Sequence, residues 1–264
     1  MSNSNSALSG NRGLVVAVLL SVVLFNVPWG RYLVYPFALL STWFHEMGHG
    51  MMATLLGCDF RRLVLNPDTS GYAVYSYSDA LGTVGRATIA SSGYLGTAVA
   101  GFLWLALRRF PRAARACLTT LALTLLVTVV WVVLHWPGDG DPPPTTGPYT
   151  LAPLWLPFFG ASVAGAWAAF LLWTVTRGPL WLVHFVYHLI AVQTALNAVL
   201  DVRGLYMVSG ASDAHTLSEL LLLPAAVWAT LWLIAGILLT GAGLWLGHSP
   251  GDTLASTSKG RGTV

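Results

Sequence analysis

Five consecutive residues, His45-Glu46-Met47-Gly48-His49, carry the clearest chemistry in the sequence. They form the pattern His-Glu-x-x-His, and residues four apart lie on one face of a helix. His45 and His49 could therefore both present an imidazole nitrogen to one Zn²⁺, while Glu46 could reach a water held by that ion and act as a general base. The alternative is a pair of buried histidines satisfied by hydrogen bonds. An unpaired glutamate inside lipid is costly, which favours the metal site.

The composition places this motif in a membrane protein. The 264-residue chain is 55% hydrophobic and 9% charged, with a mean hydropathy of +0.67, whereas soluble domains carry about 25% charged residues. Its two cysteines exclude a disulfide-rich secreted scaffold. The net charge of +3 reflects few acidic residues rather than a basic patch, so no nucleic-acid partner is expected. The expected surrounding is the lipid bilayer, crossed several times.

Seven apolar segments are candidates for crossing that bilayer, since a helix needs about 20 residues to do so. We expect an all-α bundle of six to seven transmembrane helices, because the first segment is short and could be re-entrant. This bundle should form one domain at residues 13–248, between disordered tails at residues 1–12 and 249–264. The apolar segments cover about residues 14–27, 35–56, 92–107, 117–136, 154–175, 180–208 and 217–246.

The connection after the second segment has a different pattern. Two short β-prone runs, at residues 63–65 and 72–77, flank a turn-forming stretch that contains Pro67, Asp68 and Gly71. This pattern predicts a small β-hairpin inserted at about residues 58–85. A hairpin in a helical membrane protein should lie at the interface or line a cavity, where its edges can be hydrogen-bonded.

These features together resemble a known family. The sequence HEMGH on an early transmembrane helix, the hairpin after it and Gly93-Tyr94-Leu95-Gly96 at the start of the third span are similar to the M50 metallopeptidases, the site-2-protease-like intramembrane zinc proteases, and in particular to their M50B-like branch. The resemblance extends from the second span to the last. It implies a helical bundle with a partly buried Zn²⁺ and hydrolysis of peptide bonds in a membrane-embedded or membrane-adjacent protein substrate, with Glu46 as the catalytic base.

The resemblance also implies a third metal ligand, an aspartate from a Leu-Asp-Gly motif on a later helix. Leu200-Asp201 is the nearest match, although Val202 stands where the motif has glycine. Counting the crossings puts the ends of the second and sixth spans on one membrane face, with His49 about 12 Å and Asp201 about 10 Å inside those ends. Asn197, one turn before Asp201, could hydrogen-bond Asp201 or the substrate backbone.

Other assignments remain open. Asp213 is the second candidate for the third ligand, since it lies on the same face and could begin the last helix as its N-cap. His184 and His188 could hold a second metal, but hydrogen bonding between helices is the simpler interpretation. A membrane protein that keeps the metal for structure, sensing or ion handling, without proteolysis, is the alternative function. A purely structural zinc site needs a fourth protein ligand and has no use for a general base, so Glu46 favours the protease.

Overall fold

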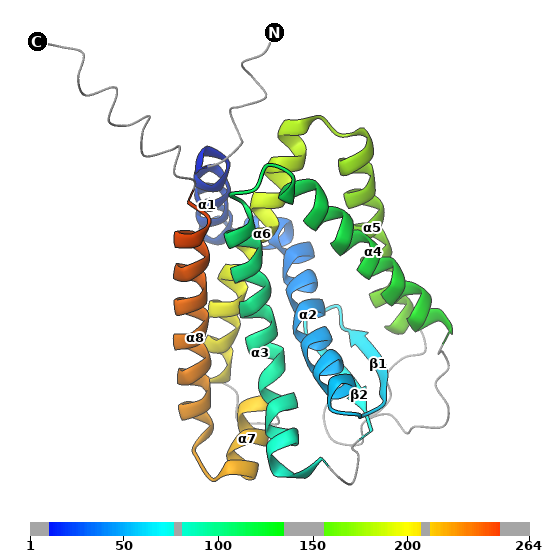
Figure 1. Ribbon diagram of the computed structural model, residues 1–264, viewed down its shortest axis with the longest axis vertical. Helices are drawn as coiled ribbons and strands as arrows, with labels where there is room; N and C mark the ends of the chain where they lie inside the picture. The colour runs from blue at the N-terminus through cyan, green and yellow to red at the C-terminus, as the bar shows by residue number, and fades with distance from the viewer. Residues whose placement is uncertain (1–10, 77–80, 135–155, 207–211, 249–264) are drawn as a thin grey trace, which may run out of the picture.

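The computed structural model describes residues 11–76, 81–134, 156–206 and 212–248. The expected tails lie outside this range, except that Asn11 and Arg12 already belong to the first helix. Figure 1 shows a bundle of long helices with one small hairpin. The elements are α1 (Asn11–Asn26), α2 (Gly30–Leu55), β1 (Phe60–Leu65), β2 (Gly71–Tyr75), α3 (Gly82–Leu107), α4 (Ala113–Leu134), α5 (Leu156–Arg177), α6 (Leu180–Leu205), α7 (Asp213–Leu221) and α8 (Ala225–Leu246).

Five of these helices, α3, α4, α5, α6 and α8, are long and apolar enough to cross a membrane. Helices α1 and α2 meet at 116° and could together make a sixth span. Pro28 lies in the break between them, where it cannot donate a backbone hydrogen bond to continue the helix. The last predicted span divides before Pro224 into the short α7 and the long α8. The prediction of a multi-pass helical bundle is confirmed, with five or six spans in the described residues.

The long helices pack in two groups. Helices α3, α6 and α8 lie side by side, while α4 and α5 pack against each other and lean away from α3 (Figure 1). Helix α2 contacts both α3 and α6. The buried core joins the groups through side chains with less than 2% exposure, among them Leu118, Leu171, Tyr187 and Ile190. The Tyr187 hydroxyl donates to the Trp104 carbonyl at 2.5 Å, which connects α6 to α3.

The predicted hairpin is present. Strands β1 and β2 are antiparallel, with Leu63 opposite Ala73 and a register irregularity near the start of β1. Its turn is held against α2, because the Thr42 hydroxyl donates to the Thr69 carbonyl at 2.5 Å and the Tyr35 hydroxyl to the Pro67 carbonyl at 2.7 Å. The hairpin therefore covers one face of the helix that carries the histidine pair.

Glycine allows α3 to approach α6. A Cβ atom on Gly101 would lie 3.0 Å from the Cα of Ala195 and 3.1 Å from its backbone nitrogen, closer than ordinary van der Waals contact. Gly165 on α5 provides a contrast, because the first atom that a Cβ there would meet is 4.0 Å away.

Gly101→Ala should therefore destabilise the bundle by about 1–3 kcal/mol, since the backbone of α6 must shift to admit the methyl group. Gly165→Ala should leave stability unchanged or raise it by up to about 1 kcal/mol, because alanine favours the helix. Thermal unfolding of both variants in the same detergent measures the difference. Equal unfolding midpoints would contradict this account of the α3–α6 contact.

Candidate metal centre

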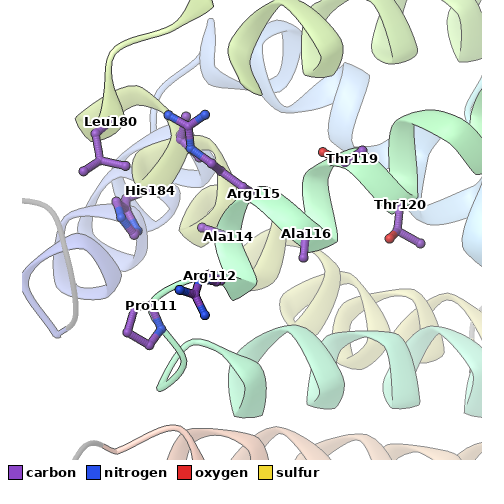
Figure 2. A pocket seen from close by; sticks show the side chains of 10 residues that line it. Pro111, Arg112, Ala114, Arg115, Ala116, Thr119, Thr120, Leu180 and His184 are labelled. Atoms are coloured by element: carbon purple, nitrogen blue, oxygen red, sulfur yellow. The ribbon is translucent and has the colours of Figure 1, made fainter. Parts of the chain in front are cut away.

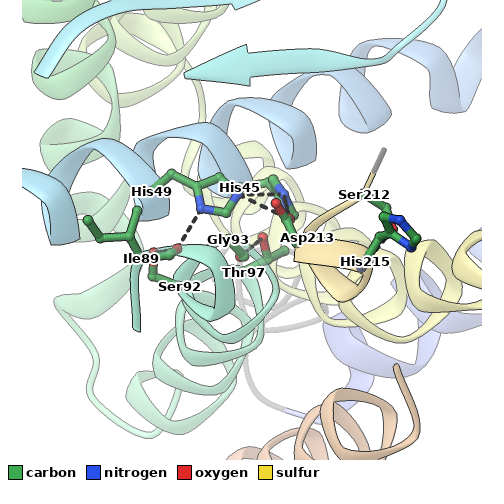
Figure 3. Close-up of polar contacts among 9 residues, drawn as sticks. All are labelled: His45, His49, Ile89, Ser92, Gly93, Thr97, Ser212, Asp213 and His215. Atoms are coloured by element: carbon green, nitrogen blue, oxygen red, sulfur yellow. Dashed lines mark hydrogen bonds and ion pairs between the residues drawn. The ribbon is translucent and has the colours of Figure 1, made fainter. Parts of the chain in front are cut away.

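The two histidines of the motif lie one turn apart on α2 and turn toward α3 (Figure 3). His49 Nδ1 lies 2.7 Å from the Ile89 carbonyl oxygen of α3. A carbonyl can only accept, so Nδ1 carries the hydrogen in this contact and the neutral ring keeps its lone pair on Nε2. The backbone of α3 thus leaves His49 with Nε2 available as a metal ligand.

A glycine on α3 leaves the space in which the histidines meet. A Cβ atom on Gly93 would contact Nε2 of His45 and of His49. The crossing of α2 and α3 is tight at this level, since a Cβ on Gly48 would contact the Ser92 carbonyl. Tyr94, the residue after Gly93, packs edge-on against the His45 ring, with the ring centroids 4.6 Å apart. The glycine-rich start of the third predicted span therefore fits closely around the histidine pair.

The short helix α7 supplies a carboxylate. Ser212 is its N-cap, with Oγ accepting from the His215 backbone N–H at 3.3 Å, and Asp213 is its first residue. Ala214 and Leu217 are buried against α3 and α8, which fixes the helix in the bundle. In Figure 3, Asp213 points toward the histidine pair while His215 points away.

Three donor atoms converge at this point. Asp213 Oδ2 lies 3.1 Å from His45 Nε2 and 3.2 Å from His49 Nε2, and the two Nε2 atoms are 3.0 Å apart. Burial alone raises the pKa of the Asp213 carboxyl. In the absence of a metal, the positive charge of protonated His49 and the hydrogen bonds with both histidines outweigh burial and hold that pKa below its usual range, so the carboxylate is ionised.

The spacing fits a tetrahedral metal ion. Zn²⁺ takes histidine nitrogen and carboxylate oxygen at about 2.0–2.1 Å, which puts two tetrahedral ligands about 3.3 Å apart. The three observed separations, 3.0 to 3.2 Å, are only slightly shorter. Among the described residues, the cluster that could hold an ion consists of His45, His49 and Asp213. Two neutral imidazoles and one carboxylate match the donor chemistry of zinc, so these residues fit the metal.

The cluster is partly exposed. The side chains of His45 and Asp213 are 20% and 26% exposed, whereas that of His49 is 7% exposed. Glu46 is buried, accepts a backbone hydrogen bond from Ala73 of β2, and lies near enough to all three donors to interact with them electrostatically. Glu46, the predicted base, thus lies between the three-donor cluster and the hairpin.

The structure favours Asp213 over Asp201 as the third ligand, because the three converging donors belong to His45, His49 and Asp213. Asp201 Oδ2 lies 3.5 Å from Ser41 Oγ, and Ser41 precedes His45 by one helical turn on α2. Helix α6 is therefore displaced along α2 relative to the alignment expected from the span ends, and Asp201 is not part of the three-donor cluster. Asn197, expected beside the metal or the substrate, is buried on α6, and its role stays a prediction.

The second histidine pair is separate from this cluster. His188 Nδ1 lies 2.7 Å from the His184 carbonyl oxygen within α6, and the two ring centroids are 6.5 Å apart. His188 therefore hydrogen-bonds within α6, and the expected hydrogen bond to another helix is not found for it among the described residues.

Comparison with known families identifies part of the chain. Residues 14–138 match the model of the Peptidase M50B-like family. This segment is M50B-like. The M50B-like segment contains His45, Glu46, His49 and Gly93, whereas Asp213 lies beyond it, so the carboxylate is assigned from geometry. No curated protein and no solved structure matches the chain.

Exchanging single carboxylates tests which aspartate completes the M50B-like site. Asp213→Asn should weaken Zn²⁺ binding by about 100-fold or more. Loss of a residue that only hydrogen-bonds a metal ligand already lowers metal affinity by about 10- to 100-fold. Asp201→Asn should change the affinity by less than about tenfold, because Asp201 hydrogen-bonds Ser41 instead. Competition with a zinc chelator measures both constants. A larger loss for Asp201→Asn would return the assignment to Asp201.

The space at Gly93 can be tested separately. Gly93→Ala should lower the zinc content of the purified protein to less than half, because its methyl group would occupy the point at which both Nε2 atoms meet. Gly96→Ala is the matched control, since its Cβ would be 3.3 Å from the Cα of Gly48 and reaches neither histidine. Metal analysis of both variants is decisive, and equal zinc contents would contradict the placement of Gly93.

Proposed function

We propose that the protein is an integral-membrane zinc peptidase that hydrolyses peptide bonds in membrane-embedded or membrane-adjacent proteins. The observation that carries this proposal is the partly exposed three-donor cluster with a buried glutamate beside it. Catalytic zinc sites have three protein ligands and one open position, whereas structural sites have four protein ligands. His45, His49 and Asp213 would hold the ion.

The residues around the cluster have distinct roles in this proposal. A bound Zn²⁺ would supply Lewis-acid activation of a water molecule and of the scissile carbonyl. Glu46 takes the proton from the attacking water and returns it to the leaving amine, which requires a carboxylate held beside the metal ligands. The Ala73 backbone N–H holds Glu46 in place, and the Ile89 carbonyl holds His49.

Two features support a peptide from the membrane as substrate. Because Ala73 directs its N–H toward Glu46 rather than toward its partner Leu63 on β1, an edge of β2 faces the base. An unwound substrate segment could add to that edge as a further strand. A largely apolar cavity of about 1100 Å³ lies between α2, α3, α4 and α7, and its walls include Phe44, Met47 and Met51. Such a cavity suits apolar side chains.

The proposal can be tested with a single substitution. Glu46→Gln should retain zinc and the fold but slow cleavage by at least about 100-fold, the range expected for loss of a general base. Glu219→Gln on α7 is the matched control, because Glu219 is exposed and pairs with His215 rather than with the cluster. Cleavage of a panel of single-span membrane proteins in liposomes, with metal analysis of each variant, gives the comparison.

The outcomes separate the two functions considered. Cleavage by Glu46→Gln at the wild-type rate would refute the peptidase mechanism. Stoichiometric zinc without cleavage of any panel member by the wild type would favour a metal site kept for structure, sensing or ion handling.

A further inference from the structure

A second cavity lies at the end of the bundle where α4 and α6 begin (Figure 2). Its volume is about 700 Å³. Its walls come from the connection before α4, from the first two turns of α4 and from the first turn of α6. Leu107 at this end of α3 is about 20 Å from Gly93 at the metal cluster, at 1.5 Å per residue. This end of the bundle is therefore well separated from the three-donor cluster.

Two arginines line this cavity without a carboxylate partner among the described residues. Arg115 Nη1 donates to the Val175 carbonyl at the end of α5 at 2.9 Å, which holds the side chain but leaves its charge uncompensated. Arg112 is exposed at the cavity wall. Neither α4, α5 nor the connection between α3 and α4 contains Asp or Glu. The cavity thus carries two guanidinium charges, with His184 beside them (Figure 2).

The backbone adds to this positive potential. Helices α4 and α6 both begin at the cavity, and the first turn of a helix carries partial positive charge on its free N–H groups. The neighbouring arginines are directed elsewhere. Arg108 Nη2 and Arg109 Nη1 each lie 3.5 Å from a carbonyl oxygen near the end of α8. Two guanidinium groups and two helix starts around one cavity favour an anion, and guanidinium is well suited to phosphate.

The surroundings indicate an anion that belongs to a lipid. Apolar side chains next to the cavity are exposed, with Phe110 at 48%, Leu180 at 41% and Trp181 at 43%. The cavity shares Ala116 and Thr120 with the apolar cavity between α2, α3, α4 and α7. A phosphate site that adjoins an apolar cavity matches a phospholipid, in which a phosphate headgroup is joined to apolar acyl chains. Basic pockets between transmembrane helices bind anionic headgroups in this way.

We propose that this cavity binds the phosphate of an anionic phospholipid through Arg112 and Arg115, with an acyl chain in the apolar cavity beyond Ala116 and Thr120. The phosphate site is separate from the three-donor cluster, whereas the acyl chain would occupy the apolar cavity proposed above for substrate side chains. It places one lipid against α4 and α6, on the side of the bundle where α4 and α5 lean away from α3.

The test uses the purified full-length protein in detergent and measures binding of phosphatidylglycerol by native mass spectrometry. The wild type should retain phosphatidylglycerol in preference to phosphatidylcholine, and phosphatidylglycerol should raise the thermal unfolding midpoint more. Arg112→Gln should weaken this binding about tenfold, the loss expected for one charge-assisted hydrogen bond. Arg112→Lys should recover part of it. Arg109→Gln is the matched control, since it removes one positive charge from the same connection but Arg109 does not line the cavity.

Three outcomes would overturn the proposal. Equal losses of phosphatidylglycerol binding in Arg112→Gln and Arg109→Gln would show that the general positive charge at this end of the bundle, rather than the cavity, attracts the lipid. Equal binding of phosphatidylglycerol and phosphatidylcholine would show that the headgroup charge is not recognised. Stabilisation by inorganic phosphate as large as that by phosphatidylglycerol would identify a soluble anion as the ligand. Arg112 is the residue chosen for the test, because Arg115→Gln would also lose the contact with the Val175 carbonyl.

Discussion

The meeting of one carboxylate with two imidazole nitrogens, all within 3.2 Å, is the constraint around which this end of the protein is built. A charged group in an apolar bundle is stable only with compensating charge or hydrogen bonds. Ser212 must therefore start α7 at the level of the histidines, Gly93 must leave room between them, and the Ile89 carbonyl must take the hydrogen of His49 Nδ1. Each of these local features has its explanation in that single contact.

The hairpin serves the same arrangement from the opposite side of α2. Its turn is hydrogen-bonded to Thr42 and Tyr35, so that β2 lies against the helix at the level of Glu46. A buried carboxylate that accepts a backbone N–H is held in one orientation, which is what a base beside metal ligands needs. The hairpin is thus part of the site although it contributes none of the three donors.

The sequence predicts the local parts of this site, whereas the choice of the third ligand depends on tertiary packing. The spacing of His45 and His49 depends only on helix geometry, and the hairpin depends on β-prone runs around a turn, so both follow from short-range rules. The choice between Asp201 and Asp213 depends on where α6 and α7 lie relative to α2, which is a matter of helix packing. Span counting cannot supply that placement. Two residues in the sequence mark α7 as a separate helix. Ser212, a typical N-cap residue, stands directly before Asp213, and Pro224 separates α7 from α8.

The third donor lies on a helix of nine residues that ends in a left-handed Leu222, and it is held in the bundle largely through Ala214 and Leu217. If these three donors hold a metal ion, its binding and the docking of α7 are linked equilibria. Docking of α7 then strengthens metal binding by a certain free energy. Bound metal must stabilise the docked helix by the same amount. Removal of such an ion would weaken the docking of α7 on α3 and α8, and a ligand that displaced α7 would weaken metal binding.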